Sequence, residues 1–157
     1  MDLPEGSFSH SPLHPEDVEV GKYTAIADGC IFHGSDNHIS AIDPKVVANN
    51  LDTTGHSKGK IIIGNDVWIG QGVRVLSGAC IGDGAIIGAG AVVSGMVEPY
   101  AIEVGNPNRV AKFRFGNKQI AALLKIAWWD WPEEKISQAK AGGDFNDIEQ
   151  FILKYGT

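Results

Sequence analysis

The sequence has 157 residues, and 43% of them are hydrophobic, which is enough for one folded domain and too apolar for a disordered chain. The formal net charge is −6 and no basic stripe runs along the chain, which argues against nucleic-acid binding. Glycine or charged residues interrupt the apolar runs every few positions, so no segment approaches the ~20 residues of a membrane span. We expect no nucleic-acid partner and no contact with a membrane.

The N-terminal residues 1–11 have neither the basic region nor the apolar region of an export signal. Cys30 and Cys80 are the only cysteines, and they lie far apart in the sequence. Without export they are expected to be reduced thiols rather than a disulfide. We therefore expect a cytoplasmic protein.

The first third of the chain contains a partial repeat. Residues 2–19 carry it weakly, with Phe8 and His14 in the apolar positions, and we expect a cap or partial coil there. A clearer coil follows, with apolar positions at Val20, Ile26 and Phe32 and small positions at Thr24, Cys30 and Asp36. Residues 38–62 break this register. We expect them to form an extended loop, and loops of that length are usually functional.

A strict hexapeptide repeat occupies the middle of the chain. An aliphatic residue recurs at every sixth position, at Ile63, Ile69, Val75, Ile81, Ile87 and Val93. A small or β-branched residue follows four positions later each time, at Val67, Val73, Ala79, Ala85, Ala91 and Val97. Such hexapeptides form short strands that stack on their equivalents one coil away, and stacking is what buries the core. We predict a parallel β-helix with three hexapeptides per coil, so that 63–80 and 81–98 form two complete coils.

The repeat ends near Pro99, and a helical tail follows. Asn117 is a candidate cap for a helix that carries Ile120, Leu123, Leu124 and Ile126 at helical spacing. Pro132 favours the start of a second helix that ends at Gly142–Gly143, and a last short helix is expected over about 144–154. Trp128, Trp129 and Trp131 are expected to pack these helices onto the β-helix or a neighbouring subunit. We predict an all-β domain over 1–115, with its loop at 38–62, and a tail over 116–157.

Several segments together resemble the xenobiotic (antibiotic) acetyltransferases of the left-handed β-helix superfamily. These are Ile63-Gly-Asn-Asp-Val-Trp-Ile-Gly70, Ile81-Gly-Asp-Gly-Ala-Ile-Ile-Gly-Ala-Gly-Ala-Val-Val93, Gly105-Asn-Pro-Asn-Arg-Val110 and Trp128-Trp-Asp-Trp-Pro132. The resemblance covers roughly residues 20–155. It implies a left-handed prism and a homotrimer with active sites between subunits. It also implies acetyl-CoA as the donor, transferred directly to a hydroxyl or amine of an antibiotic-like or sugar acceptor.

His38 is the candidate catalytic base. It lies where the repeat register breaks, and a neutral imidazole, whose pKa is ordinarily about 6.5, can take a proton from an attacking hydroxyl or amine. The family's catalytic histidine has the same Asn-His context, here Asn37-His38. Asp36 and Asn37 are candidates for orienting the ring and for contacting the acceptor. Trp68, expected in a turn of the first full coil, is a candidate for stacking on the acceptor, as its equivalent does in related galactoside-type acetyltransferases.

The resemblance also implies which residues bind CoA. Gln71 would offer its backbone N–H to the thioester oxygen, with Trp68 nearby. Ala89, one predicted coil later, would contact the pantetheine arm, and Ser94 and Gly95 are expected further along the same face. Arg109 and Lys112 follow the last coil and are candidates for binding the nucleotide phosphates.

Two alternatives remain open from the sequence. His33 lies five positions before His38, and two histidines at that spacing help to bind zinc in gamma-class carbonic anhydrases, which share the β-helix. A third zinc ligand is difficult to assign, because only His14, His56 and, less well placed, His10 are available. We therefore expect no metal. The other alternative is a trimeric β-helix protein without activity.

Overall fold

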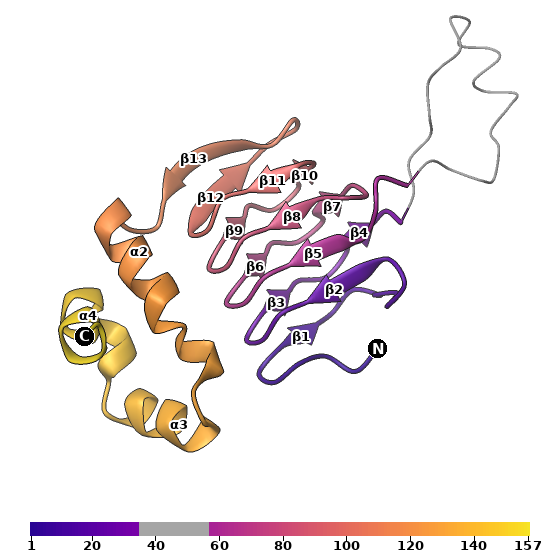
Figure 1. Ribbon diagram of the computed structural model, residues 1–157. Coiled ribbons are helices and arrows are strands. Elements are labelled where there is room, and N and C mark those ends of the chain that lie inside the picture. Colours follow the sequence, from indigo (N-terminus) through magenta and orange to yellow (C-terminus); the bar gives the residue numbers. More distant parts are fainter. Residues whose placement is uncertain (35–56) are drawn as a thin grey trace, which may run out of the picture.

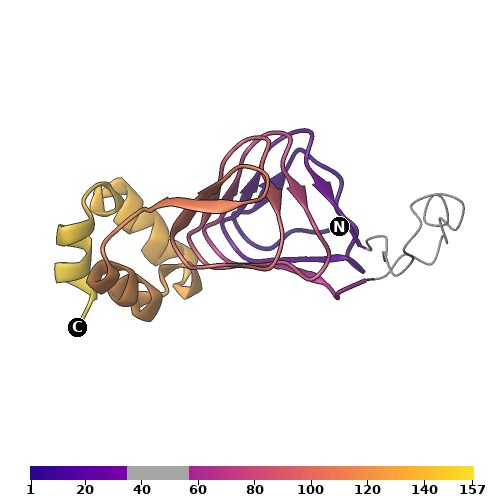
Figure 2. The same ribbon diagram turned by 90° about the horizontal axis from the view of Figure 1, so that it is seen from above.

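A computed structural model describes residues 1–34 and 57–157. The chain winds into a prism of stacked coils, and the C-terminal helices lie beside one of its edges (Figures 1 and 2). Each coil passes through three parallel sheets, which we call A, B and C. The three edges of the prism are named by the sheets that they join, as the AB, AC and BC corners.

The strands are short, as a hexapeptide repeat requires. Sheet A has the order β1 (Phe8–Ser9), β3 (Ala25–Ile26), β6 (Trp68–Ile69), β9 (Ile86–Ile87), β12 (Ala101–Val104) and β13 (Arg109–Phe113). Sheet B contains β2 (Val18–Val20), β5 (Ile61–Ile63), β8 (Cys80–Ile81) and β11 (Met96–Val97). Sheet C contains β4 (Ile31–Phe32), β7 (Arg74–Val75) and β10 (Val92–Val93). The described pairs are parallel except for the hairpin that joins β12 to β13.

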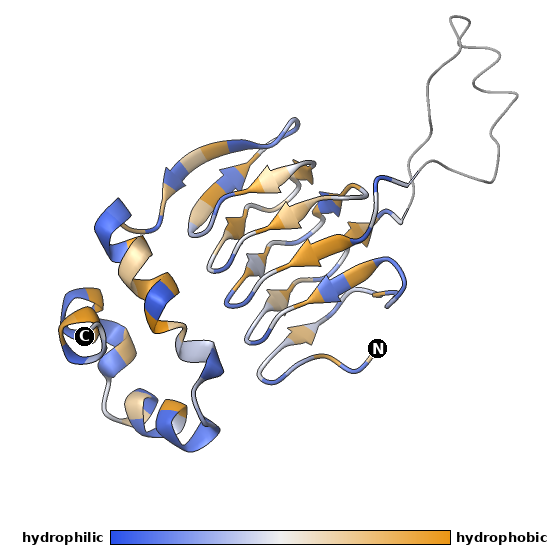
Figure 3. Cartoon of the chain, in the orientation of Figure 1, coloured by the Kyte–Doolittle hydropathy of each residue, from blue (hydrophilic) through white to orange (hydrophobic). Residues whose placement is uncertain are grey.

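The core confirms the hexapeptide period. The aliphatic positions point inward and are at most 1% exposed, from Ile63 through Val93. The small positions beside them are equally buried, because the prism has no room for larger side chains there. Ile63 pairs with Ile81, its equivalent in the next coil, as three hexapeptides per coil require. The strands carry most of the apolar residues, and the turns between them are more polar (Figure 3).

The last coil departs from the prediction. Val97, expected in a small position, instead pairs with Ile81 in the aliphatic position of sheet B. The coil from Ile81 to Val97 is therefore shorter than the coil before it, because only Ser94 and Gly95 join β10 to β11. The β-helix also continues past Pro99, since β12 stacks on β9 and places Glu103 against Ile87. Likewise β5 begins at Ile61, so the end of the expected loop lies in sheet B.

The three corners differ in the residues that take up the left-handed backbone conformation. Glycine occupies it at the AC corner in Gly29, Gly72 and Gly90, and at the BC corner in Gly78 and Gly95. At the AB corner the equivalent residues are Tyr23, Asp66, Gly84 and Tyr100. A side chain in this conformation costs about 1–2 kcal/mol. The AB corner thus presents side chains at Tyr23, Asp66 and Tyr100, whereas the AC and BC corners have glycine at the positions given above.

The tail packs against this AB corner. It consists of α2 (Asn117–Ile126), η1 (Trp128–Asp130), α3 (Glu133–Ala141), η2 (Asp144–Asn146) and α4 (Ile148–Tyr155). Trp128 and Trp129 are buried, and the Trp128 ring lies 4.9 Å from the ring of Tyr23, which confirms a packing role.

The helix ends differ in part from the prediction. Asn117 is the first residue of α2, and Gly116 occupies the cap position that we assigned to Asn117. Helix α3, the second of the predicted helices, ends at Ala141 with Gly142 as its C-cap, as predicted, but Asp144 belongs to a short 3₁₀ turn. The cap of α4 is Asp147, whose carboxylate accepts hydrogen bonds from two backbone N–H groups of the first turn. No helix in the described ranges is long and apolar enough to span a bilayer.

Candidate active site

The proposed catalytic base, His38, lies outside the described residues, as do its neighbours Asp36 and Asn37. The described chain before them ends in sheet C, where His33 donates a backbone hydrogen bond to the Val75 carbonyl at 2.8 Å. The described chain resumes at Ser57 and enters sheet B with β5.

Gln71 and Ala89 lie together, one coil apart, at the AC corner. The Gly90 N–H donates to the Gln71 carbonyl at 2.9 Å, and the Gly72 N–H donates in the same way to Asp28 in the coil before. No backbone acceptor within the described residues is recorded for the Gln71 N–H. A Cβ at Gly72 or Gly90 would meet nothing within 4 Å. This corner therefore offers accessible backbone on which a narrow ligand can lie.

Trp68 lies on strand β6 of sheet A, not in a turn as we expected. Its side chain points out of the prism and is 55% exposed, because the neighbouring Ile69 takes the inward position. It pairs with Ala25 below and Ile86 above. The indole is thus available on the sheet that leads into the Gln71 corner.

Ser94 and Gly95 do not lie at the same corner as Ala89. They form the BC corner between β10 and β11, at the opposite end of sheet C. Ser94 follows Ala89 along one coil, across the face of sheet C, whereas only residues about one coil apart share a corner. The Ser94 N–H donates to the Asn108 side-chain carbonyl at 3.2 Å, which ties this corner to the β12–β13 hairpin.

Arg109 and Lys112 lie on β13, which is exposed along its whole length. Arg109 pairs with Val104 next to the hairpin turn, and Lys112 pairs with Ile102 further along. Asn108, the residue before Arg109, donates its side-chain N–H to the buried carboxylate of Glu103. The structure therefore brings Arg109 and Ser94 to the same end of the prism through Asn108, and it places Lys112 farther from that turn.

Arg74 is a cation that the sequence interpretation missed. It is exposed on the outward face of sheet C, between Ile31 and Val92 of the neighbouring strands. The residues expected to bind CoA flank this sheet, with Gln71 and Ala89 at one edge and Ser94 at the other. The sequence did contain a signal for this residue. Arg74 immediately precedes Val75, an inward-facing aliphatic position of the hexapeptide period, so its own side chain had to face outward.

Within 1–34 and 57–157, no group of three His, Cys, Asp or Glu side chains is placed to hold a metal ion. Of the histidines considered for zinc, His10, His14 and His33 are described, whereas His38 and His56 are not. Both cysteines are free thiols, and Cys30 is buried in its small position with its thiol directed at the Gly70 carbonyl.

Comparison with known proteins decides the family. Residues 60–95 match the family described as Bacterial transferase hexapeptide (six repeats). A probable macrolide acetyltransferase of Lysinibacillus sphaericus is 41% identical over 130 residues, which cover 74% of this chain and 71% of that protein. The chain belongs to the hexapeptide-repeat acetyltransferases. The prism is accordingly of the left-handed type, as the resemblance implied.

Other hexapeptide-repeat acetyltransferases support this membership. Chloramphenicol acetyltransferases of Escherichia coli and Morganella morganii are 48% and 46% identical over 132 and 144 residues, or 76% and 81% of this chain. The chain spans 62% and 68% of the length of these two relatives. Among solved structures, AntD, an N-acyltransferase from Bacillus cereus, has the same fold, with a TM-score of 0.51 and 22% identity over 69% of this chain and 56% of that one.

Proposed function

We propose that the protein transfers an acetyl group from acetyl-CoA to a hydroxyl or amine of a small, antibiotic-like molecule. The observation that carries the proposal is the 41–48% identity to relatives named as macrolide and chloramphenicol acetyltransferases. Family membership favours this chemistry over zinc-dependent hydration of carbon dioxide. Because the chain spans only part of these relatives, the acceptor is proposed as a chemical class.

His38 is proposed as the general base. Its neutral imidazole takes the proton from the acceptor while the acceptor oxygen or nitrogen attacks the thioester carbon. When the tetrahedral intermediate collapses, the carbon–sulfur bond breaks and the imidazolium returns the proton to the CoA thiolate. Asp36 and Asn37 are proposed to orient the ring and contact the acceptor. One base serves both proton transfers, so no acetyl-enzyme is required.

The AC corner is proposed to bind the reactive end of acetyl-CoA. The Gln71 N–H would donate to the thioester oxygen as negative charge develops there, and one such donor is typically worth about 10²–10³ in turnover. The pantetheine arm would pass Ala89, where the small side chain leaves the backbone accessible. Trp68 would stack on the acceptor from sheet A.

The opposite end of the donor is proposed to lie across sheet C and the end of the prism. Ser94 and Gly95 would contact the arm at the BC corner. Arg109 and Lys112 would pair with the nucleotide phosphates, since both cations are exposed on β13. Arg74 is added to this set because its position on sheet C lies between the two corners.

The test compares two histidine variants in a free-thiol assay with acetyl-CoA and either chloramphenicol or a macrolide. His38→Ala should lower turnover by about 10²–10⁴ and leave the calorimetric affinity for acetyl-CoA unchanged. His33→Ala is the matched control and should keep wild-type turnover. Bound zinc and hydration of carbon dioxide, both lost in His33→Ala, would establish the carbonic-anhydrase alternative. A protein that binds neither zinc nor acetyl-CoA would instead be the inactive β-helix.

A further inference from the structure

Glu103 is a buried carboxylate to which the proposed acetyl transfer assigns no role. Among the described residues it is the one charged residue that is buried, with an exposed fraction of 5%. It takes the inward position of β12, whereas the inward residues of the three coils before it are isoleucines: Ile26, Ile69 and Ile87. Burial of a carboxylate is costly unless hydrogen bonds replace its bonds to water. The contacts of Glu103 therefore indicate why the last coil keeps an acid at this position.

Glu103 contacts Asn108, which completes the edge of sheet C. Strand β10 lies at one end of this sheet, and the turn 105–108 supplies acceptors for its outer N–H groups. The Val92 N–H donates to the Gly105 carbonyl at 3.0 Å, and the Ser94 N–H donates to the side-chain carbonyl of Asn108 at 3.2 Å. The amide NH2 group of Asn108 in turn donates to the Glu103 carboxylate. The turn is thus held along β10 by one backbone bond and one side-chain bond.

Glu103 fixes the direction in which the Asn108 amide faces. An asparagine side chain has one accepting oxygen and one donating NH2 group, whereas a carboxylate only accepts hydrogen bonds. The NH2 group must therefore face Glu103, which leaves the oxygen for the Ser94 N–H. With an apolar residue at position 103 the amide would lose this constraint, and its bond to Ser94 would weaken.

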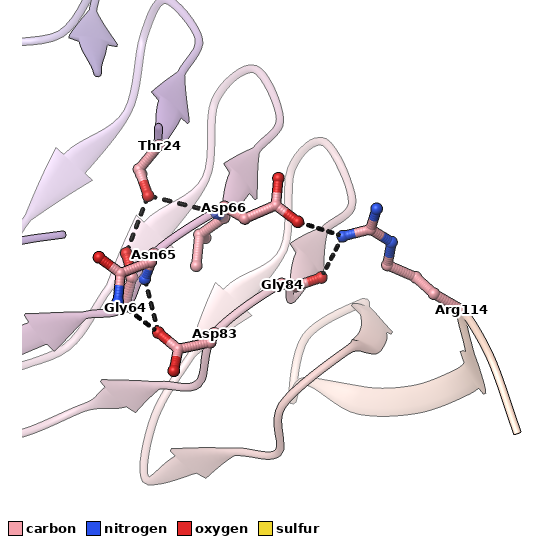
Figure 4. Close-up of polar contacts among 8 residues, drawn as sticks. Thr24, Gly64, Asn65, Asp66, Asp83, Gly84 and Arg114 are labelled. Atoms are coloured by element: carbon pink, nitrogen blue, oxygen red, sulfur yellow. Dashed lines mark hydrogen bonds and ion pairs between the residues drawn. The ribbon is translucent and has the colours of Figure 1, made fainter. Parts of the chain in front are cut away.

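The same arrangement occurs at the AB corner, where it also joins neighbouring coils. The side-chain oxygen of Asn65 accepts a hydrogen bond from the Lys22 N–H at 2.8 Å, and its NH2 group donates to Asp83 at 3.0 Å (Figure 4). An acid that orients an asparagine is thus used twice in this fold. Asp83 provides a control for Glu103, because the AB corner lies away from the residues proposed to bind CoA.

Arg109 depends on this turn for its position. It directly follows Asn108 and is the first residue of β13. Its side chain is directed back over the turn, since a Cβ added to Gly105 would lie 3.2 Å from Nη1 of Arg109. The guanidinium therefore lies close to the turn that Asn108 holds along β10. If the turn were released from Ser94, Arg109 would no longer be held beside sheet C.

We propose that Glu103 is a positioning residue for the acetyl donor: through Asn108 it holds Arg109 beside sheet C, in place for the phosphates of CoA. The inference rests on the proposed function, in which Arg109 binds these phosphates. It also makes a prediction that charge alone reverses. Because a carboxylate repels phosphate, loss of the Glu103 charge by itself would strengthen the binding of CoA. Loss of its hydrogen bond to Asn108 should weaken that binding.

The test compares Glu103→Val with Glu103→Gln by calorimetry with CoA. Both variants remove the negative charge, but only glutamine keeps an oxygen that can accept the bond from Asn108. Glu103→Val should weaken CoA about five-fold, and Glu103→Gln should stay within about two-fold of wild type. Asp83→Ala breaks the equivalent pair at the AB corner and should leave the affinity for CoA unchanged. Circular dichroism establishes that each variant is folded.

Two further measurements test whether the effect passes through Arg109. In an Arg109→Ala background, Glu103→Val should weaken CoA no further, because the cation that it positions is already absent. S-acetylpantetheine lacks the nucleotide and all the phosphates, so its kcat/KM in the free-thiol assay should be the same in wild type and Glu103→Val. A purely structural role of Glu103 would instead lower the kcat/KM of both donors.

Unchanged or tighter binding of CoA by Glu103→Val would overturn the positioning role, as would equal weakening by Glu103→Val and Glu103→Gln. Hydrogen exchange of the Ser94 amide follows the network without CoA: it should be slow in wild type and Glu103→Gln and faster in Glu103→Val. Faster exchange with unchanged CoA affinity would reject the positioning role and leave the proposed function standing. Slow exchange in a wild-type protein that binds no CoA would reject the proposed function, and the positioning role with it.

Discussion

Asp66 shows how a single residue fixes the segment that leads from the β-helix into the tail. Its backbone turns the AB corner with φ at +54°, and its carboxylate accepts the hydrogen bond from Arg114. Both side chains are about one quarter exposed. Burial raises the pKa of Asp66, and the charge and hydrogen bond of Arg114 oppose that rise. The effect of burial is the larger of the two, so the folded protein holds a proton at Asp66 more tightly than the unfolded chain does.

The ion pair predicts a pH-dependent response to Arg114→Met. Without the guanidinium the pKa of Asp66 should rise further, measured by carboxyl-carbon NMR titration. Because the folded-state pKa is the raised one, the free energy of unfolding falls as the pH rises through it. At neutral pH the free energy of unfolding of the variant should be lower than that of wild type by about 1–2 kcal/mol, which is less than for a fully buried ion pair. In acid, where Asp66 is protonated, the difference should be smaller.

Asp144 provides an internal control for that titration. Hydrogen bonds from Lys154 and Tyr155 lower the pKa of its carboxyl, and Arg114 is not among its partners. Its titration should therefore be the same in wild type and Arg114→Met. A pKa of Asp66 that falls or stays constant in the variant would contradict the assigned role of Arg114.

At the scale of the strands and coils, much of the fold follows from the sequence. The period of six identified the inward residues because a narrow prism admits one aliphatic and one small side chain per hexapeptide. It also placed Gln71 and Ala89 at one corner, since they are three hexapeptides, or one coil, apart. It failed after Val93, where a short corner of Ser94 and Gly95 shortens the coil. The sequence period alone cannot reveal a coil of different length. The difference becomes visible only when the structure shows which residue pairs with the last aliphatic position.

The coil architecture predicts opposite outcomes for two adjacent isoleucines of β9. Ile87 is fully buried in the prism, whereas Ile86 points outward and is partly exposed. Ile87→Ala should lower the free energy of unfolding by about 2–5 kcal/mol, because removing the side chain leaves a cavity among rigid coils. Ile86→Ala should lower the free energy of unfolding clearly less, and urea titration of both variants measures the difference. Equal losses in the two variants would be incompatible with the assigned register.

At the scale of the whole molecule, the proposed active site is divided between corners. Gly34, the last described residue before His38, lies after β4 at the BC end of sheet C, whereas Gln71 lies at the AC end. The sequence named Gln71, Ala89, Ser94 and Gly95 but did not assign them to two corners, because spacing along the chain does not by itself reveal which corner each residue reaches. Large apolar side chains are also exposed on the outward faces, among them Trp68, Met96 and Phe8. Both features support the proposed homotrimer with active sites between subunits.

Subunit mixing tests that arrangement. In solution the mass should be about three times the 16.7 kDa of one chain. Ala89→Trp should block the proposed pantetheine path, and His38→Ala should remove the base, so each homotrimer should be inactive. If one chain supplies His38 and its neighbour the Ala89 corner, random mixed trimers regain intact sites at about a quarter of the wild-type number.

The measurement is the free-thiol assay on the two variants, unfolded together and refolded, against each refolded alone. Recovery near a quarter of wild-type turnover would assign His38 and Ala89 of one site to different chains. If both residues of a site came from the same chain, mixed trimers would contain no intact site and the mixture would stay inactive. Refolded wild type must regain its activity for this comparison to hold. An inactive mixture whose trimers are shown to be mixed would therefore reject the shared site and leave the hexapeptide coil architecture unaffected.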